Sequence, residues 1–128
     1  MTQQDPKFEA GMQLRHAMFG TALAEDRHRA ATDFNRPFED LVTRYCFGEV
    51  WTRPGLDRAT RSLLTLAILA TQGRAAPLRA HVQGAIANGC TKEQIRETLL
   101  HTAIYAGVPA GAEAFGHAAQ VLGALGLD

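Results

Sequence analysis

The stretch DRATRSLLTLAILATQG, residues 57–73, decides the fold of this chain. Asp57 is suited to cap the start of a helix, and Gly73 is suited to follow its end. Between them, residues 63–70 are apolar at almost every position and do not alternate as a half-buried strand does. A helix that is apolar nearly all round is buried on most sides. Few helices of a small domain can be surrounded by their own chain, so we expect part of this surface to meet another subunit.

Glycine and proline divide the rest of the chain into further helix-length pieces. Thr91 and Gln94 form a capping box, and Asn35 is a plausible N-cap for a helix that Gly48 ends. Residues 21–32 are polar and receive no assignment, and no segment has the period of a strand. The sequence therefore predicts an all-α protein, a compact bundle of five to six helices. The expected helices span residues 5–19, 35–48, 57–72, 76–88, 91–106 and 110–125.

Composition restricts the class of protein. The 128 residues suit one domain, residues 1–128, and 13 basic residues balance 13 acidic ones. Nucleic-acid binding needs a clustered basic excess, and a membrane span needs about 20 apolar residues; neither is present. The N-terminus lacks the pattern of a signal peptide, so we expect a cytoplasmic protein with no nucleic-acid or membrane partner.

Cys46 and Cys90 have no metal or redox spacing and are expected to be free thiols that simply pack.

Two Glu–His pairs are candidate metal ligands. Glu97 and His101 are four residues apart, as are Glu113 and His117. Di-metal sites in helical bundles use Glu and His three apart, with further carboxylates from other helices. Pairs at four-residue spacing more often stabilise their own helix, so we predict no metal site.

Several side chains are candidates for chemistry, and each has a simpler structural interpretation. His81 shares the apolar face of its helix with Leu78 and Val82, where a lone histidine is more often a satisfied core residue than an acid or base. His101 and Tyr105 continue a polar stripe from Glu97 that is also typical of an exposed face.

Three more candidates lie around the start of the 57–72 helix. Arg61 sits in its early turns, where the helix dipole disfavours cations, so a surface pair or an anionic ligand is indicated. Trp51 and Arg53 lie on a Pro-Gly loop, the kind of segment that often carries binding residues.

The run FGEVWTRPGL at residues 47–56 resembles a signature of the carboxymuconolactone decarboxylase family. The likeness covers about residues 33–114 and continues through TRSL at 60–63, RAHV at 79–82, NGCT at 88–91 and HTAIYAGVPA at 101–110. Alkylhydroperoxidase D-like proteins of the same superfamily use Cys-x-x-Cys followed by a histidine. His81 matches that histidine, but Arg74 and Pro77 stand at the cysteine positions and Ser62 at the position of an upstream Glu. Peroxidase chemistry is therefore excluded.

The resemblance is greatest to family members of the protocatechuate branch of the β-ketoadipate pathway. It implies an alkylhydroperoxidase D-like helical fold and decarboxylation of 4-carboxymuconolactone, a dianionic lactone, to β-ketoadipate enol-lactone and CO2. The unsaturated lactone accepts the electrons itself, so no cofactor is expected. The resemblance also implies a homo-oligomer, commonly a hexamer, with pockets near subunit contacts.

The resemblance assigns expected roles to the candidates. His81 would protonate carbon or donate to the dienolate oxygen, and arginines would grip the carboxylates. Two other interpretations stay open: a family member acting on a different lactone or β-keto acid, and a non-catalytic helical oligomer that binds a small acid or a protein partner. The expected catalytic residues are His81, Glu49 and Arg61, and the expected substrate-binding residues are Trp51, Arg53, His101 and Tyr105.

Overall fold

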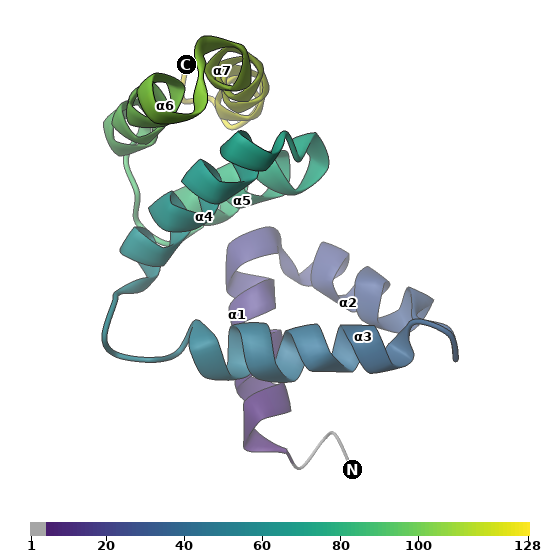
Figure 1. Cartoon of the computed structure of the whole chain (residues 1–128). Coiled ribbons are helices and arrows are strands. Elements are labelled where there is room, and N and C mark those ends of the chain that lie inside the picture. The colour runs from purple at the N-terminus through teal and green to yellow at the C-terminus, as the bar shows by residue number, and fades with distance from the viewer. Residues whose placement is uncertain (1–4) are drawn as a thin grey trace. The chain divides into compact units, whose positions relative to one another are not determined.

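The computed structural model describes residues 5–128, which are helical and contain no strand (Figure 1). The all-α prediction is confirmed, but the predicted number of helices was too low because residues 21–30 are helical. The chain forms two compact units, Met1–Arg58 and Ala59–Asp128. The elements are α1 (Pro6–Phe19), α2 (Thr21–Ala30), α3 (Arg36–Leu41), the π-helix η2 (Val42–Val50), α4 (Arg58–Gln72), α5 (Ala75–Ala87), α6 (Lys92–Ala106) and α7 (Val108–Ala124).

Helix α1 begins and ends as local signals predict. The Asp5 carboxylate accepts a hydrogen bond from the Lys7 backbone N–H at 2.9 Å, and Pro6 opens the first turn. Gly20 ends the helix with a φ of 92°, which favours glycine, and α2 follows directly. Helix α2 packs on α1 through the buried Ala24. This burial explains why a polar segment without a clear apolar stripe is nevertheless helical.

The helix predicted from Asn35 to Gly48 differs from the structure at both ends. The Asn35 side chain makes no cap; its Oδ1 accepts from the backbone N–H of Thr32 at 2.6 Å. Gly48 does not end the helix but lies inside η2, which continues α3 to Val50. A Cβ at Gly48 would overlap the carbonyl oxygen of Lys7, and one at Gly11 would overlap that of Thr43. The two glycines therefore allow the backbones of α1 and η2 to touch.

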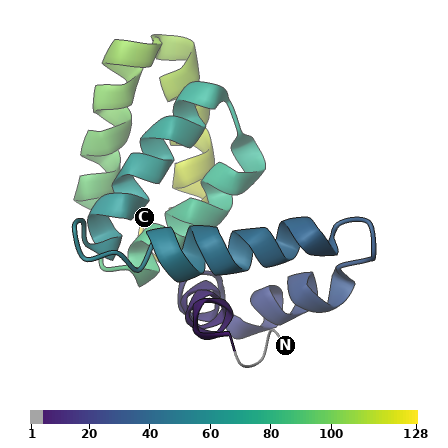
Figure 2. The same cartoon turned by 60° about the horizontal axis from the view of Figure 1, so that its bottom comes forward.

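The second unit contains the remaining helices, of which α6 and α7 run side by side (Figure 2). Gly73 follows α4 with a φ of 67°, as predicted. The capping box is confirmed, with the Gln94 N–H donating to the Thr91 hydroxyl at 3.0 Å and the Thr91 N–H donating to the Gln94 side chain at 2.9 Å. Helix α7 starts earlier than predicted because Pro109 lies in its first turn rather than beyond the end of α6.

Helix α4 is buried on one face only. Leu66 and Ala70 lie in the core of the second unit, whereas Leu64 and Ile68 are exposed. The sequence predicts burial of this helix on most sides, but within the chain only one of its faces is buried. Within residues 5–128, no helix combines the length and the apolar character that crossing a membrane requires.

Candidate active site

The first unit places three predicted site residues around the end of η2. The Trp51 backbone N–H donates to the carbonyl of Cys46 at 2.9 Å, five residues back, which is the π-helical spacing. The Trp51 ring is buried and stacks on Phe47, with ring centroids 5.9 Å apart. Arg53 is exposed two residues later. Since π-helical turns are rare and often found at functional sites, this segment is a good place for binding residues.

Glu49 is held by a partner that the sequence did not suggest. Its carboxylate forms an ion pair with Lys7 of α1, and the Lys7 ammonium also lies over the Tyr45 ring at 5.3 Å from its centroid. The hydrogen bond and charge of Lys7 lower the pKa of Glu49, with a smaller contribution from the Arg53 cation. Glu49 is therefore ionised at neutral pH, and its carboxylate is directed to α1.

In the second unit, Arg61 and Ser62 lie near the start of α4. The Arg61 side chain is half-buried, and its backbone carbonyl accepts a hydrogen bond from the Thr65 hydroxyl at 2.8 Å. Ser62 is fully buried and accepts from the Asn88 side chain at 3.0 Å. The serine at this position thus ties α4 to the end of α5.

His81 lies on α5 beside the core residues Leu78 and Val82. Its side chain is largely removed from water, and this burial lowers the pKa of His81 from 6.5 to about 4. The imidazole is therefore neutral at pH 7, when roughly one ring in a thousand carries a second proton. A neutral ring donates a hydrogen bond from one nitrogen and accepts at the other.

An open groove of about 410 Å³ lies between α4 and α6 in the second unit. This volume falls within the usual range for small-molecule sites. His101 lies in the groove, and its ring stacks on that of Tyr105 with centroids 4.8 Å apart. The groove is lined by Thr60, Leu63, Leu64, Ala67, Glu97, Thr98, His101 and Thr102.

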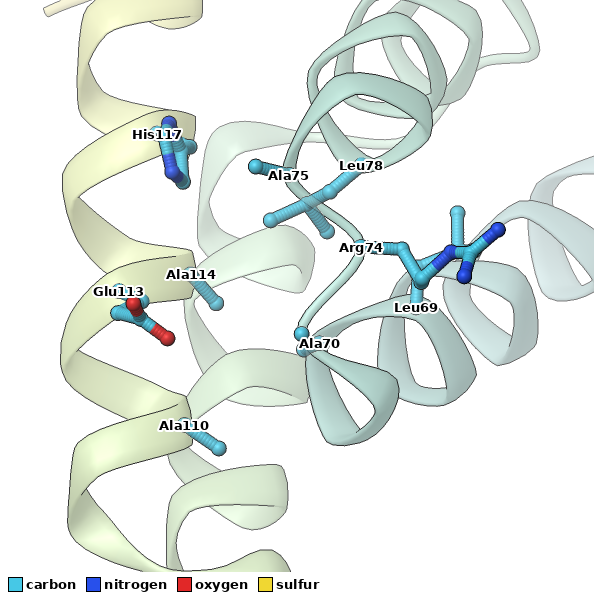
Figure 3. A pocket seen from close by; sticks show the side chains of 10 residues that line it. Leu69, Ala70, Arg74, Ala75, Leu78, Ala110, Glu113, Ala114 and His117 are labelled. Carbon is cyan, nitrogen blue, oxygen red and sulfur yellow. The ribbon is translucent and has the colours of Figure 1, made fainter.

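A second hollow, at the turn between α4 and α5, is too small for an organic substrate. Its volume is about 30 Å³, which is room for a water molecule or two. Glu113 and His117 face it from α7, whereas the Arg74 side chain runs away from them (Figure 3). The His117 Nδ1 also lies 3.3 Å from a guanidinium nitrogen of Arg79.

The predicted site residues thus divide between the two units. Glu49, Trp51 and Arg53 belong to the first unit, and the other four belong to the second, where the rings of His101 and Tyr105 stack. Across residues 5–128, no cluster of three or more His, Cys, Asp or Glu side chains has the arrangement of a metal site. Cys46 is an exposed free thiol, and Cys90 is a buried one.

Sequence reasoning missed two cations of α1. Lys7 pairs with Glu49, and the buried Arg15 donates to Thr43 at 2.9 Å. A signal was present, because Lys7, Gly11 and Arg15 recur every four residues and so share one face of the helix. That face packs against η2.

Comparison with known proteins agrees with the likeness of the signature segments. The model of the carboxymuconolactone decarboxylase family matches residues 36–120. The chain is 37% identical over 123 residues to the 4-carboxymuconolactone decarboxylase of Acinetobacter baylyi, covering 96% of this chain and 92% of that protein. It is 45% identical over 107 residues to the nitrosuccinic acid decarboxylase npaB of Metarhizium robertsii, covering 84% and 75%.

A third relative has no assigned activity. An uncharacterised 15.0 kDa protein of Paracoccus denitrificans is 40% identical over 104 residues, covering 80% of this chain and 77% of that protein. A family match over most of the chain, together with relatives above 30% identity along most of their length, is decisive. This chain belongs to the carboxymuconolactone decarboxylase family.

Proposed function

We propose that this chain is a carboxy-lyase that converts 4-carboxymuconolactone to β-ketoadipate enol-lactone and CO2 in protocatechuate catabolism, without a cofactor. The observation that carries the proposal is the 37% identity to a 4-carboxymuconolactone decarboxylase over 96% of the chain. The family match runs from the first unit into the second, which supports treating residues 1–128 as one domain with the alkylhydroperoxidase D-like fold.

The substrate supplies its own electron sink. The leaving carboxylate is on the γ carbon of an unsaturated lactone. When its C–C bond breaks and CO2 departs, the electron pair moves through the C=C bond to the lactone carbonyl and forms a dienolate. The α carbon then takes a proton that comes ultimately from solvent, which gives the enol-lactone. The protein has to hold a dianion and stabilise the oxygen on which negative charge develops.

His81 is the proposed catalyst at that oxygen. Its lowered pKa, caused by burial, favours the neutral ring, so hydrogen-bond donation to the dienolate is better supported than proton transfer from an imidazolium. A neutral donor also works at constant strength between pH 6 and 8, and we expect turnover to be flat over that range.

The remaining side chains are assigned to substrate binding. Arg61 and Arg53 bind the two carboxylates, because a guanidinium can donate two parallel hydrogen bonds to a carboxylate. Glu49, which the family resemblance places among the catalytic residues, would act as a positioning residue that orients Arg53 through the charge interaction that also lowers the pKa of the Glu49 carboxyl. Trp51 is assigned to shielding the substrate from water. His101 and Tyr105 are assigned as polar binding groups, because His101 lines the groove between α4 and α6 and its ring stacks on that of Tyr105.

Nitrosuccinate is the second candidate substrate, and the 45% identity to a nitrosuccinic acid decarboxylase favours it. In both reactions, a group within the substrate accepts the electron pair of the broken C–C bond. In nitrosuccinate the departing carboxylate is next to a nitro group, which accepts the electron pair as a nitronate, and a second carboxylate remains. A neutral hydrogen-bond donor and two arginines suit either dianion. A different lactone or β-keto acid fits the same requirements.

We propose further that the protein is a cytoplasmic homo-oligomer, with a hexamer favoured by family resemblance. Exposed apolar side chains on the second unit support an assembly, because soluble monomers rarely expose large contiguous apolar patches. They include Leu64 and Ile68 on α4, Leu100, Ile104 and Tyr105 on α6, and Val108 at the start of α7.

The test is turnover of 4-carboxymuconolactone, made in situ from β-carboxymuconate by a cycloisomerase, beside turnover of nitrosuccinate. We expect wild-type CO2 release from the lactone and a loss of at least ~100-fold in His81→Ala. His81→Gln, which keeps an N–H donor, should retain more activity than His81→Ala. Release from nitrosuccinate alone would transfer the assignment to the second substrate. Release from neither would favour a non-catalytic oligomer that binds a small acid or a protein partner.

A further inference from the structure

Arg15 is a buried charge that the proposed chemistry does not use. It lies on α1 with only 6% of its surface exposed. Burying a guanidinium is costly unless its charge and its N–H groups find partners. The partners here are the Thr43 hydroxyl at 2.9 Å and the Glu39 carboxylate at 3.4 Å, and the guanidinium carbon lies 5.7 Å from the centroid of the Phe47 ring.

These three partners lie on one face of the helix that carries the candidate site. Glu39, Thr43 and Phe47 are four residues apart in turn, and they run from α3 into η2. The Arg15 side chain therefore spans the junction where α-helix changes to π-helix. Threonines elsewhere in the chain, such as Thr65 and Thr102, donate to the carbonyl four residues back, whereas the Thr43 hydroxyl accepts from Arg15.

The contact continues from Phe47 to the site. Phe47 stacks on Trp51 at 5.9 Å with 27° between the ring planes, and it also meets Phe19 in a T-shaped contact at 5.8 Å. Trp51 and Phe47 are buried together with Leu14 and Met18 of α1. A guanidinium held by two polar partners thus lies over the Phe47 ring, which in turn stacks on Trp51.

We propose that Arg15 is a positioning residue for the substrate-binding end of η2. By holding Thr43 and Phe47, it sets the orientation of Trp51 and, through the same turn, of the following Arg53. The inference rests on the proposed function for the statement that Trp51 and Arg53 contact substrate. The effect of Arg15 on Trp51 does not depend on it.

The test uses Trp51 as the reporter, because it is the only tryptophan of the chain. Arg15→Met keeps the apolar stem and removes the charge and both hydrogen bonds. We expect a red-shifted Trp51 emission and greater acrylamide quenching, with wild-type helix content by circular dichroism. Arg29→Met is the matched control, because Arg29 is an exposed arginine of the same unit that pairs with Glu25 and Asp26 of its own helix, and it should behave as wild type.

Kinetics separate positioning from loss of folded protein. A displaced binding residue raises KM, whereas a smaller folded fraction lowers kcat at unchanged KM. We expect a ~10–100-fold fall in kcat/KM for Arg15→Met, mostly in KM, since a misplacement of about 1 Å can cost ~100-fold. Arg15→Lys, which keeps the charge without the planar fork, should be intermediate.

A folded Arg15→Met protein with unchanged Trp51 quenching would overturn the proposal. If that variant does not fold, Thr43→Val decides, because it removes the acceptor at nearly constant volume; unchanged quenching in Thr43→Val overturns the proposal equally. If wild type decarboxylates neither substrate, the proposed function fails, and the quenching comparison still determines whether Arg15 positions Trp51.

Discussion

At the scale of single residues, His81 shows what burial does to a titratable group. Its pKa falls from 6.5 to about 4 because the charged ring loses hydration. Between these two pH values the unfolded chain binds a proton that the folded chain does not. The free energy of unfolding therefore rises with pH across this window, and above about pH 7 the group has no further effect.

The comparison of wild type with His81→Gln measures this contribution. In urea unfolding between pH 4 and 7, we expect the free energy of unfolding to fall more steeply for wild type than for the variant. The difference should reach about 1.4 kcal/mol per pH unit as the pH falls from 6.5 to 4. The other four histidines are common to both proteins and cancel in the difference. An equal decrease in the free energy of unfolding of the two proteins would show that folding does not lower the pKa of His81.

At the scale of the elements, the crossing of α1 and η2 depends on two glycines. A Cβ on Gly48 would overlap the Lys7 carbonyl oxygen, which belongs to backbone and cannot move aside cheaply. We expect Gly48→Ala to lower the free energy of unfolding by about 3 kcal/mol or to prevent folding. Gly11→Ala should act in the same way, because its Cβ would overlap the Thr43 carbonyl oxygen.

Gly116→Ala is the control for this prediction. Gly116 lies inside α7, and a Cβ there meets no atom within 4 Å. Alanine should stabilise that helix by about 0.5–1 kcal/mol, because glycine is the poorer helix former. The denaturation midpoints of Gly48→Ala and Gly116→Ala would thus move in opposite directions from that of wild type. Equal midpoints would mean that the helices do not approach closely at Gly48.

At the scale of the whole molecule, the proposed homo-oligomer rests on the exposed apolar side chains of the second unit. Ile104 is 79% exposed and Tyr105 81%, one turn from Leu100. We expect Ile104→Glu to lower the mass measured by sedimentation, because it would bury a charge in the proposed subunit contact. Gln83→Glu adds the same charge at an exposed position of α5 and should leave the mass unchanged. A wild-type protein that sediments as a monomer would refute the proposed assembly.

The sequence by itself determined the helical class, most helix ends and the family. The Thr91 capping box and the helix ends at Gly73 and Gly107 can be predicted from sequence, because a cap involves groups only a few residues apart. The signature around Trp51 is likewise contiguous. Signals of this kind do not depend on what the rest of the chain does.

Only the tertiary structure decided the π-helical form of η2, the helical state of residues 21–30 and the partners of the site residues. Gly48 looked like a helix end, but contact with α1 makes it the closest point of a helix crossing. Arg15 and Thr43 meet across 28 residues of chain, and Lys7 and Glu49 are also brought together by that crossing. Such pairings arise when two helices pack, and local propensity carries no information about which side chains will then face each other.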